Sequence, residues 1–156
     1  MGSEMCIRDS KSRKSNRGRN AGGGIAIVYN KMRIRLNEFS LRKGNIEIVC
    51  ATGKVPNNPR TLAIIAAYIP PKNTAKQDKQ TLEYISDLII KLKDDLNDPI
   101  IVLAGDFNRR KIELAYQDHV DLKLHDSPPT RGAARLDLVV SNIDDCSIVL
   151  LSLIHI

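Results

Sequence analysis

The segment Ile100 to Asn108, IIVLAGDFN, decides the fold. Its first five residues are a continuous apolar run, which is typical of a strand buried on both faces of a sheet. Gly105 ends this run, and Asp106 and Asn108 follow two residues apart. Because side chains i and i+2 share one face of a strand, both polar groups can point at one place. The segment predicts a core strand that ends in a carboxylate and a carboxamide.

A carboxylate beside a carboxamide suits the hydrolysis of a phosphodiester. The carboxylate can orient or deprotonate water, and the amide can hydrogen-bond a phosphate oxygen. The four residues Gly105 to Asn108 also suit a turn that ends a strand, with glycine, aspartate and asparagine present for backbone reasons. On these residues alone the turn interpretation is favoured, so the function has to be inferred from the surrounding sequence.

Upstream of this strand, the segment Thr74 to Asn97 predicts a helix. Its apolar residues recur at three- and four-residue spacings and form one stripe: Leu82, Ile85, Leu88, Ile89, Leu92 and Leu96. Thr74 is a suitable N-cap, and Asp98-Pro99 ends the helix because proline cannot continue it. A helix with a single apolar stripe is expected to cover one face of a sheet.

Short apolar segments on both sides of the helix predict strands. They are Ile25–Tyr29, a half-exposed Met32–Leu36, Ile46–Val55, Thr61–Tyr68, Leu136–Val140 and the beginning of one at Ile148–Leu150. The turn residues Pro56 to Pro59 favour a hairpin, and the pairings are expected to be antiparallel. A short helical pattern covers Arg110–Tyr116. Strands outnumber helices, and helix material covers one face, which predicts an α+β layered architecture.

Both ends of the chain look foreign to this domain. Gly2–Asp9 (GSEMCIRD) resembles the translation of an adapter from transposase-made sequencing libraries, and Leu151–Ile156 (LSLIHI) matches the same adapter end read on the opposite strand. Because both matches have the correct orientation, we expect residues 1–10 and 151–156 to be adapter-derived and not native. Residues 11–150 are then a partial domain, and Cys6 and His155 drop out as candidate ligands.

The composition sets broad limits on function. The 156 residues carry a formal net charge of +6, and 42% are apolar. No apolar run approaches a membrane span and no leader resembles a signal peptide, so no membrane partner is expected. Excluding Glu4, Arg8 and Asp9, which together carry one negative charge, raises the net charge to +7, which suits a polyanion but is also common without one. Cys50 and Cys146 have no metal-binding spacing and are expected to be buried free thiols.

Four segments match, in order, the endonuclease/exonuclease/phosphatase superfamily. They are GGGIAIVYN (22–30), AAYIPP (66–71), LAGDFN (103–108) and PTRGAARLDLVVSN (129–142). The segment GDFN together with the TRG and LD block is highly specific, and the resemblance covers roughly residues 17–150. The glycine triplet after a basic stretch and the compact last block most resemble LINE-type, non-LTR retrotransposon endonuclease domains. This resemblance implies a deoxyribonuclease I-like layered β-sandwich with flanking helices, truncated at both ends.

The resemblance also implies roles for individual residues. Asp106 would activate or orient the attacking water, and Asn108 would hold the scissile phosphate. Tyr68 would contact the phosphate or the leaving group, and Thr130 would donate its hydroxyl to the phosphate. Asp137 would hydrogen-bond and orient a catalytic histidine.

Several of these residues also have a structural explanation. Tyr68 suits a half-buried strand position, and Thr130 suits a cap or turn after two prolines. Asp137 lies inside an apolar strand, where an unpaired carboxylate is unfavourable. Without the resemblance it would need a local partner, for which Arg135 is the candidate.

Other polar residues are candidates for binding rather than catalysis. A polar stretch before the glycines contains four cations that could neutralise DNA phosphates: Arg13, Lys14, Arg17 and Arg19. A solvated loop is an equal alternative for this stretch. His119 and His125 match no catalytic position and are expected to be surface histidines.

The resemblance implies groups that this chain does not contain. An asparagine and a glutamate, the principal Mg²⁺ ligand, would precede the glycine-rich segment, and an Asp-His pair would follow the last core strand. We therefore expect an internal fragment that is inactive by itself, and its own metal ligands stay unassigned.

Together these features predict a parent protein that is a Mg²⁺-dependent DNA endonuclease. It would nick one strand and leave a 3′-hydroxyl that primes reverse transcription. DNA as partner, a reverse transcriptase domain on the same polypeptide, and an intracellular, nuclear place of action follow from the resemblance, whereas the oligomeric state does not. The alternatives are a phosphomonoesterase of the same superfamily acting on lipid or inositol phosphates, and a catalytically dead nucleic-acid-binding module.

Overall fold

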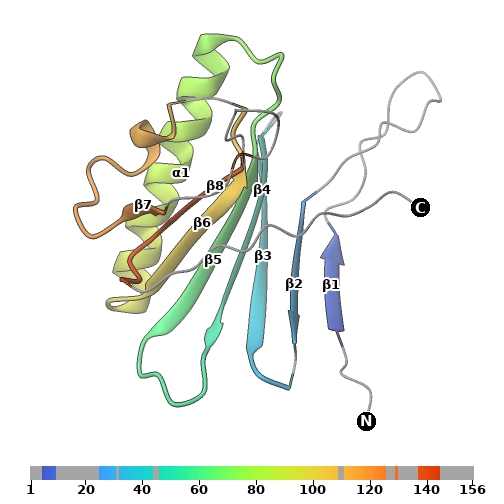
Figure 1. Cartoon of the computed structure of the whole chain (residues 1–156), viewed down its shortest axis with the longest axis vertical. Coiled ribbons are helices and arrows are strands. Elements are labelled where there is room, and N and C mark those ends of the chain that lie inside the picture. Colours follow the sequence, from blue (N-terminus) through green and yellow to red (C-terminus); the bar gives the residue numbers. More distant parts are fainter. Residues whose placement is uncertain are drawn as a thin grey trace, which may run out of the picture.

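The structure is a computed structural model, and it describes residues 5–9, 25–30, 32–43, 46–108, 111–125, 129 and 137–144. The elements in chain order are β1 Met5–Asp9, β2 Ala26–Asn30, β3 Arg35–Lys43, β4 Ile46–Lys54, β5 Thr61–Tyr68, α1 Ala75–Leu96, β6 Ile100–Asp106, the 3-10 helix η1 Ile112–Ala115, β7 Lys123–His125 and β8 Asp137–Ser141. The strands form a six-stranded sheet in the order β3-β4-β5-β6-β8-β7 and a separate sheet of β1 and β2 (Figure 1).

The large sheet is covered by different elements on its two faces. On one face α1 buries its apolar stripe against the sheet, where Ile65, Ile101 and Leu103 are fully buried. On the other face Ile27 of β2 packs with Val49 of β4 and its neighbour Ala51. The layers are therefore helix, large sheet and small sheet, which confirms the predicted α+β layered architecture.

The predicted helix is confirmed, and local hydrogen bonds explain where it begins. The backbone N–H of Gln77 donates to Thr74 Oγ1 at 3.3 Å, and Gln77 Oε1 accepts from the Thr74 N–H at 2.8 Å. This reciprocal pair is a capping box, which satisfies two donors that a helix end leaves open. At the other end Asn97 and Asp98 take positive φ angles of 49° and 53°, and Pro99 follows.

The expectation of antiparallel pairing is wrong for the two central strands. β5 and β6 are parallel, with Tyr68 in register with Asp106, whereas the other pairs of the large sheet are antiparallel. Parallel neighbours need a crossover that carries the chain back to the starting edge. The 22 residues of α1 supply it, because a helix of that length spans about 33 Å.

Two predicted strands differ in detail. The alternation at residues 32–36 predicts one strand, but Met32 and Arg33 form a turn because Asn30 accepts hydrogen bonds from both backbone N–H groups. β3 begins after this turn. In β6 the apolar run predicts burial on both faces, yet Val102 and Ala104 are only half-buried. On the face toward α1 the apolar side chains of β6 are buried. On the other face the small sheet packs over β4 and β5, so β6 is only partly covered there.

The remaining predictions have mixed outcomes. The helical pattern at residues 110–116 is the short 3-10 helix η1, and β7 was not predicted. Cys50 is a buried free thiol as predicted, and its burial raises its pKa to about 11. The predicted strand at residues 148–150 and Cys146 lie outside the described residues.

β1 lies within the residues that we expect to be adapter-derived. It pairs with β2 along five residues in antiparallel register. An exposed strand edge presents unpaired backbone groups and can bind an extended segment of any origin, so the adapter assignment stays a prediction. Within the described part of the chain, no helix has the length and apolar character needed to cross a membrane.

Gly105 allows the close approach of β5 and β6. A Cβ at this position would collide with the backbone carbonyl of Ala67, and the backbone φ is +158°. We therefore predict that Gly105→Ala lowers the free energy of unfolding by about 1–3 kcal/mol, the usual range for overpacking. Urea denaturation followed by circular dichroism measures this change. An unchanged midpoint would show that β5 and β6 can move apart to fit the added methyl group without loss of stability.

Candidate functional site

Three of the predicted site residues lie next to one another across three adjacent strands. Tyr68 at the end of β5 is in register with Asp106 at the end of β6, and Asp106 is in register with Asp137 at the beginning of β8. Residues directly opposite on neighbouring strands point to the same face, and neighbouring strands lie about 4.7–4.9 Å apart. The sheet therefore brings one phenol and two carboxylates into a single line.

Burial of the neighbouring residues fixes the face on which this line lies. Ala67 and Ile69 flank Tyr68 and are buried in the core beneath α1. Phe107 follows Asp106 and is fully buried in the same core. Because successive strand side chains alternate, these apolar neighbours hold Tyr68 and Asp106 on the face away from α1.

Asn108 is held in place by two hydrogen bonds. Its backbone N–H donates to Asp106 Oδ1 at 3.0 Å, and its side-chain Nδ2 donates to the carbonyl of Ile69 at 2.8 Å. Its φ of 47° is one that asparagine tolerates better than most residues. The turn interpretation of this segment is therefore correct, and the same turn ties the carboxamide to the ends of both β5 and β6.

Glu47 extends the line by one strand, and sequence reasoning missed it. It lies in β4 directly opposite Tyr68, and its side chain is half-buried. We call the four residues Glu47, Tyr68, Asp106 and Asp137 the polar row. The available signal was a single acidic residue inside the apolar segment 46–51, but without the pairing register nothing connected it to Tyr68.

The remaining predicted residues have different positions. Asp137 was expected to lie inside an apolar strand, but it is the first residue of β8 and its side chain is exposed. The expected pairing of Asp137 with Arg135 stays a prediction. Thr130 and Arg135 lie outside the described residues, as do the four basic candidates Arg13, Lys14, Arg17 and Arg19.

The expectation that both histidines lie at the surface is wrong for His119. It is 7% exposed, and its Nε2 lies 3.3 Å from Ser86 Oγ on α1. Burial lowers its pKa below the usual 6.5, and Lys93 lowers it further, against the opposing effects of Asp121 and Asp118. His119 therefore helps to attach the segment after η1 to the helix.

His125 is half-buried rather than fully exposed. Its Nε2 lies 2.6 Å from Ser141 Oγ, across the pairing of β7 with β8. Both histidines therefore have contacts with side chains of neighbouring elements, and neither belongs to the polar row.

The described residues contain no group of three or more His, Cys, Asp or Glu side chains that could hold a metal ion. Mg²⁺, however, is often bound through one or two carboxylates, with water and substrate phosphate as the other ligands. Asp106 and Asp137, opposite each other on β6 and β8, are a donor set of that kind. The chemistry of these two residues is thus compatible with the predicted Mg²⁺.

No family model matches the sequence, and no curated protein matches it. The fold, in contrast, is similar to several solved structures. The catalytic domain of human Nocturnin has a TM-score of 0.67 at 17% identity, over 88% of this chain and 60% of that chain. A mannosyl-6-phosphatase from Bacteroides thetaiotaomicron has a TM-score of 0.61 at 12% identity, over 88% and 62%.

The endonuclease domain of TRAS1, a telomere-specific non-LTR retrotransposon, has a TM-score of 0.54 at 15% identity, over 88% of this chain and 66% of that chain. These structures are of the endonuclease/exonuclease/phosphatase type, so the chain has the deoxyribonuclease I-like fold of that superfamily, as its sequence predicts. The chain spans about 60% of the length of the solved structures matched first. At these identities the likeness establishes the fold and leaves the activity to be inferred.

The lowered pKa of His119 predicts a pH dependence of stability. The unfolded chain binds a proton near pH 6.5 and the folded chain only at lower pH, so the neutral histidine favours folding above pH 6.5. This contribution is lost as the pH falls through the folded pKa. We therefore expect the free energy of unfolding to decrease between pH 7 and pH 5, and His119→Gln to reduce that decrease.

Urea denaturation at both pH values tests this prediction. Burial raises the pKa of Asp121, but Lys93 lowers it more, so that it lies below its usual value of 3.8. The titration of Asp121 therefore lies outside the range between pH 7 and pH 5. The same pH dependence in the wild type and in His119→Gln would contradict the assignment to His119.

Proposed function

We propose that this chain is part of a Mg²⁺-dependent endonuclease that nicks DNA in the life cycle of a non-LTR retrotransposon. The observation that carries the proposal is the register that aligns Tyr68, Asp106 and Asp137 on one face. The similarity to the TRAS1 endonuclease domain supports it. Since the chain spans about 60% of the solved structures matched first, the activity is proposed for the longer parent protein.

The polar row and Asn108 provide the groups for phosphodiester hydrolysis. Asp106 accepts a proton from a water molecule whose oxygen attacks phosphorus. The second amide N–H of Asn108, next to the one bound to Ile69, donates to a non-bridging phosphate oxygen as charge develops there. The bond from phosphorus to the 3′-oxygen breaks, and the phenol of Tyr68 donates a proton to that oxygen. The products are a 3′-hydroxyl and a 5′-phosphate.

Asp137 and Glu47 complete the row on either side. Asp137 faces Asp106 across the β6–β8 pair, and both carboxylates would contact Mg²⁺. Bound Mg²⁺ would polarise the phosphate and offset its negative charge. Glu47 lies beside Tyr68 in register, on the side of the row opposite to Asp137.

The remaining elements of the proposal concern the parent protein. Its partner is DNA, and a reverse transcriptase domain on the same polypeptide would extend the 3′-hydroxyl that the nick leaves. Such a reaction takes place on chromosomal DNA, which makes the nucleus the place of action. The downstream reading frame of the parent gene tests this directly, because absence of a reverse transcriptase would remove the retrotransposon assignment.

Removal of the Asp106 carboxylate tests the catalytic assignment. The parent domain should nick supercoiled plasmid with Mg²⁺, and Asp106→Ala should lower the nicking rate by about 100-fold or more, the usual contribution of a general base. Asp94→Ala is the matched control, since Asp94 is exposed on α1 outside the polar row. Conversion of plasmid to the open circular form is measured on gels. Unchanged nicking by Asp106→Ala would mean that another carboxylate has this role.

A phosphomonoesterase is the second candidate, because one solved structure with this fold is a mannosyl-6-phosphatase. Lipid or inositol phosphates would be its substrates, and the same polar row would act on a terminal phosphate. Release of inorganic phosphate from inositol phosphates, without plasmid nicking, would favour this candidate. Binding of DNA with neither reaction would favour a catalytically dead module.

A further inference from the structure

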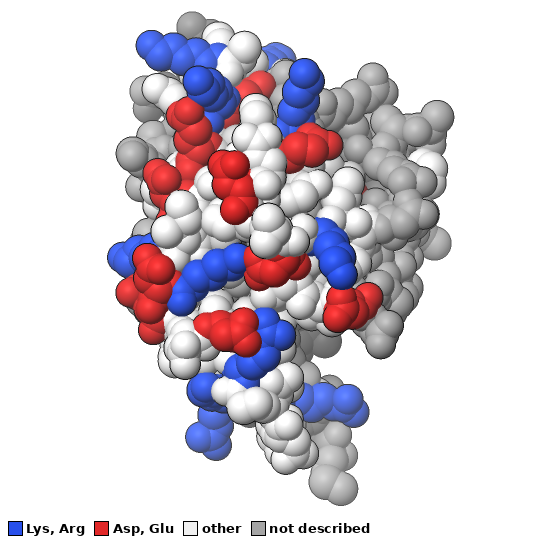
Figure 2. All heavy atoms as spheres, turned by 90° about the vertical axis from the view of Figure 1, so that its left-hand side faces the viewer, with Lys and Arg blue, Asp and Glu red and all other residues white. Residues whose placement is uncertain are grey.

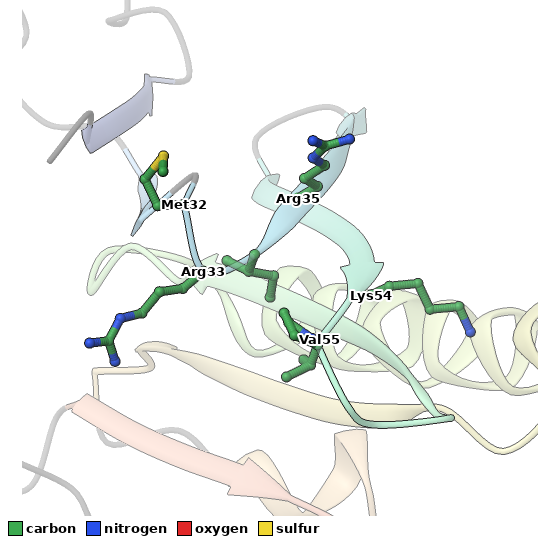
Figure 3. Close-up of a pocket in the computed structure, with 7 residues that line it drawn as sticks. Met32, Arg33, Arg35, Lys54 and Val55 are labelled. Carbon is green, nitrogen blue, oxygen red and sulfur yellow. The ribbon is translucent and has the colours of Figure 1, made fainter.

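A hollow of about 350 Å³ lies at the end of the large sheet far from the polar row. The turn between β2 and β3 forms one side, and the first residues after β4 form the other. Its lining consists of Met32, Arg33, Ile34, Arg35, Lys54, Val55 and Pro56. Figure 3 shows the side chains of Arg33, Arg35 and Lys54 extending from the rim in three directions. We call this site the cationic hollow.

Several described cations outside this hollow have carboxylate partners. Arg60 pairs with Asp98 at 3.2 Å, and Lys123 pairs with Asp144 at 2.8 Å. The lining of the hollow contains no acidic residue, and among the described residues neither Arg33 nor Arg35 has a carboxylate in ion-pair distance. Two exposed guanidinium groups therefore have their hydrogen-bond donors available for an anion.

The pairing register adds an unfavourable contact. Arg35 is directly opposite Lys54 on the antiparallel β3–β4 pair. Like charges in this position destabilise a sheet, by an amount comparable to the gain from an opposite pair. The ammonium of Lys54 donates to the carbonyl of Pro59 at 3.2 Å, a neutral partner that leaves its charge in place. A phosphate bound at either side chain would offset this repulsion.

The base of the hollow is apolar. Ile34, Val55 and Pro56 contribute to it, and Met32 beside it is 82% exposed. Its ligand should therefore combine repeated negative charge with flat apolar groups. Nucleic acid has this combination, in its phosphates, sugars and bases.

We propose that the cationic hollow binds the backbone of a nucleic acid, with phosphates at Arg33, Arg35 and Lys54. The hollow is separate from the polar row, because Lys54 follows Glu47 by seven residues along β4, about 24 Å at the rise of a strand. Because seven is an odd number of positions, Lys54 and Glu47 also point to opposite faces of the sheet, so the two sites do not share one surface.

The surface over α1 provides the comparison. Lys and Arg side chains there alternate with Asp and Glu (Figure 2). Lys79, for example, pairs with Glu83 at 3.6 Å on the same helix. Substitutions on α1 therefore change the net charge without changing the cationic hollow.

The test compares two double variants with the same change in net charge. Arg33→Gln/Arg35→Gln removes two cations of the hollow, and Lys79→Gln/Lys91→Gln removes two exposed cations of α1. Binding to a fluorescein-labelled 30-base-pair duplex is measured by anisotropy between 50 and 200 mM salt. The slope of log K against log salt should become shallower by about 1.8 for the hollow variant, because each phosphate contact contributes about 0.9. It should be nearly unchanged for the α1 variant.

Further variants keep the result interpretable. Arg33→Lys/Arg35→Lys retains both charges and should have the same slope as the wild type. If the double glutamine variant loses its circular dichroism signal, Arg33→Gln alone, which changes a residue of the β2–β3 turn, should reduce the slope by about 0.9. Equal effects of the hollow and α1 variants, or no effect of either, would overturn the proposal. Equal competition by polyglutamate of matched charge would also overturn the assignment to nucleic acid. None of these measurements depends on hydrolysis, so they stand apart from the plasmid-nicking experiment.

Discussion

The parallel pairing of β5 with β6 is the contact on which both the core and the polar row depend. α1 connects the two strands and buries its apolar stripe on one face, so alternate residues of each strand are committed to that core. The residues between them must face the other way. Tyr68 and Asp106 are therefore aligned by the burial of Ile69 and Phe107, and the side chains that build the core also set the direction of the candidate catalytic groups.

Two pairs of like charges stand opposite each other in register, one at each end of the sheet. Asp106 faces Asp137 between β6 and β8, and Arg35 faces Lys54 between β3 and β4. Opposed like charges disfavour strand pairing, and a sequence selected for stability alone would avoid them. Local conflicts of this kind concentrate at functional sites, where a ligand of opposite charge removes the repulsion. The acidic pair fits a cation and the basic pair fits phosphate.

The sequence predicts those elements whose signals are local. The period of the apolar residues identifies α1, and the capping residue Thr74 identifies its beginning. The apolar run before Asp106 likewise predicts a core strand. Pairing partners are set by contacts distant in the sequence, so neither the parallel β5–β6 pair nor the place of Glu47 beside Tyr68 could be predicted. His119 follows the same rule, because its neighbours Asp118 and Asp121 suggest a surface position while distant Ser86 and Lys93 determine its environment.

The two ends of the sheet can act independently at physiological salt. Their separation of about 24 Å along β4 exceeds the screening length of about 8 Å at that ionic strength. The carboxylates of the polar row therefore do not cancel the attraction of the cationic hollow for an anion. The two sites also differ in face, because Glu47 and Lys54 are an odd number of residues apart on β4. A nucleic acid at the basic end would therefore be held separately from a phosphate that reaches the acidic end.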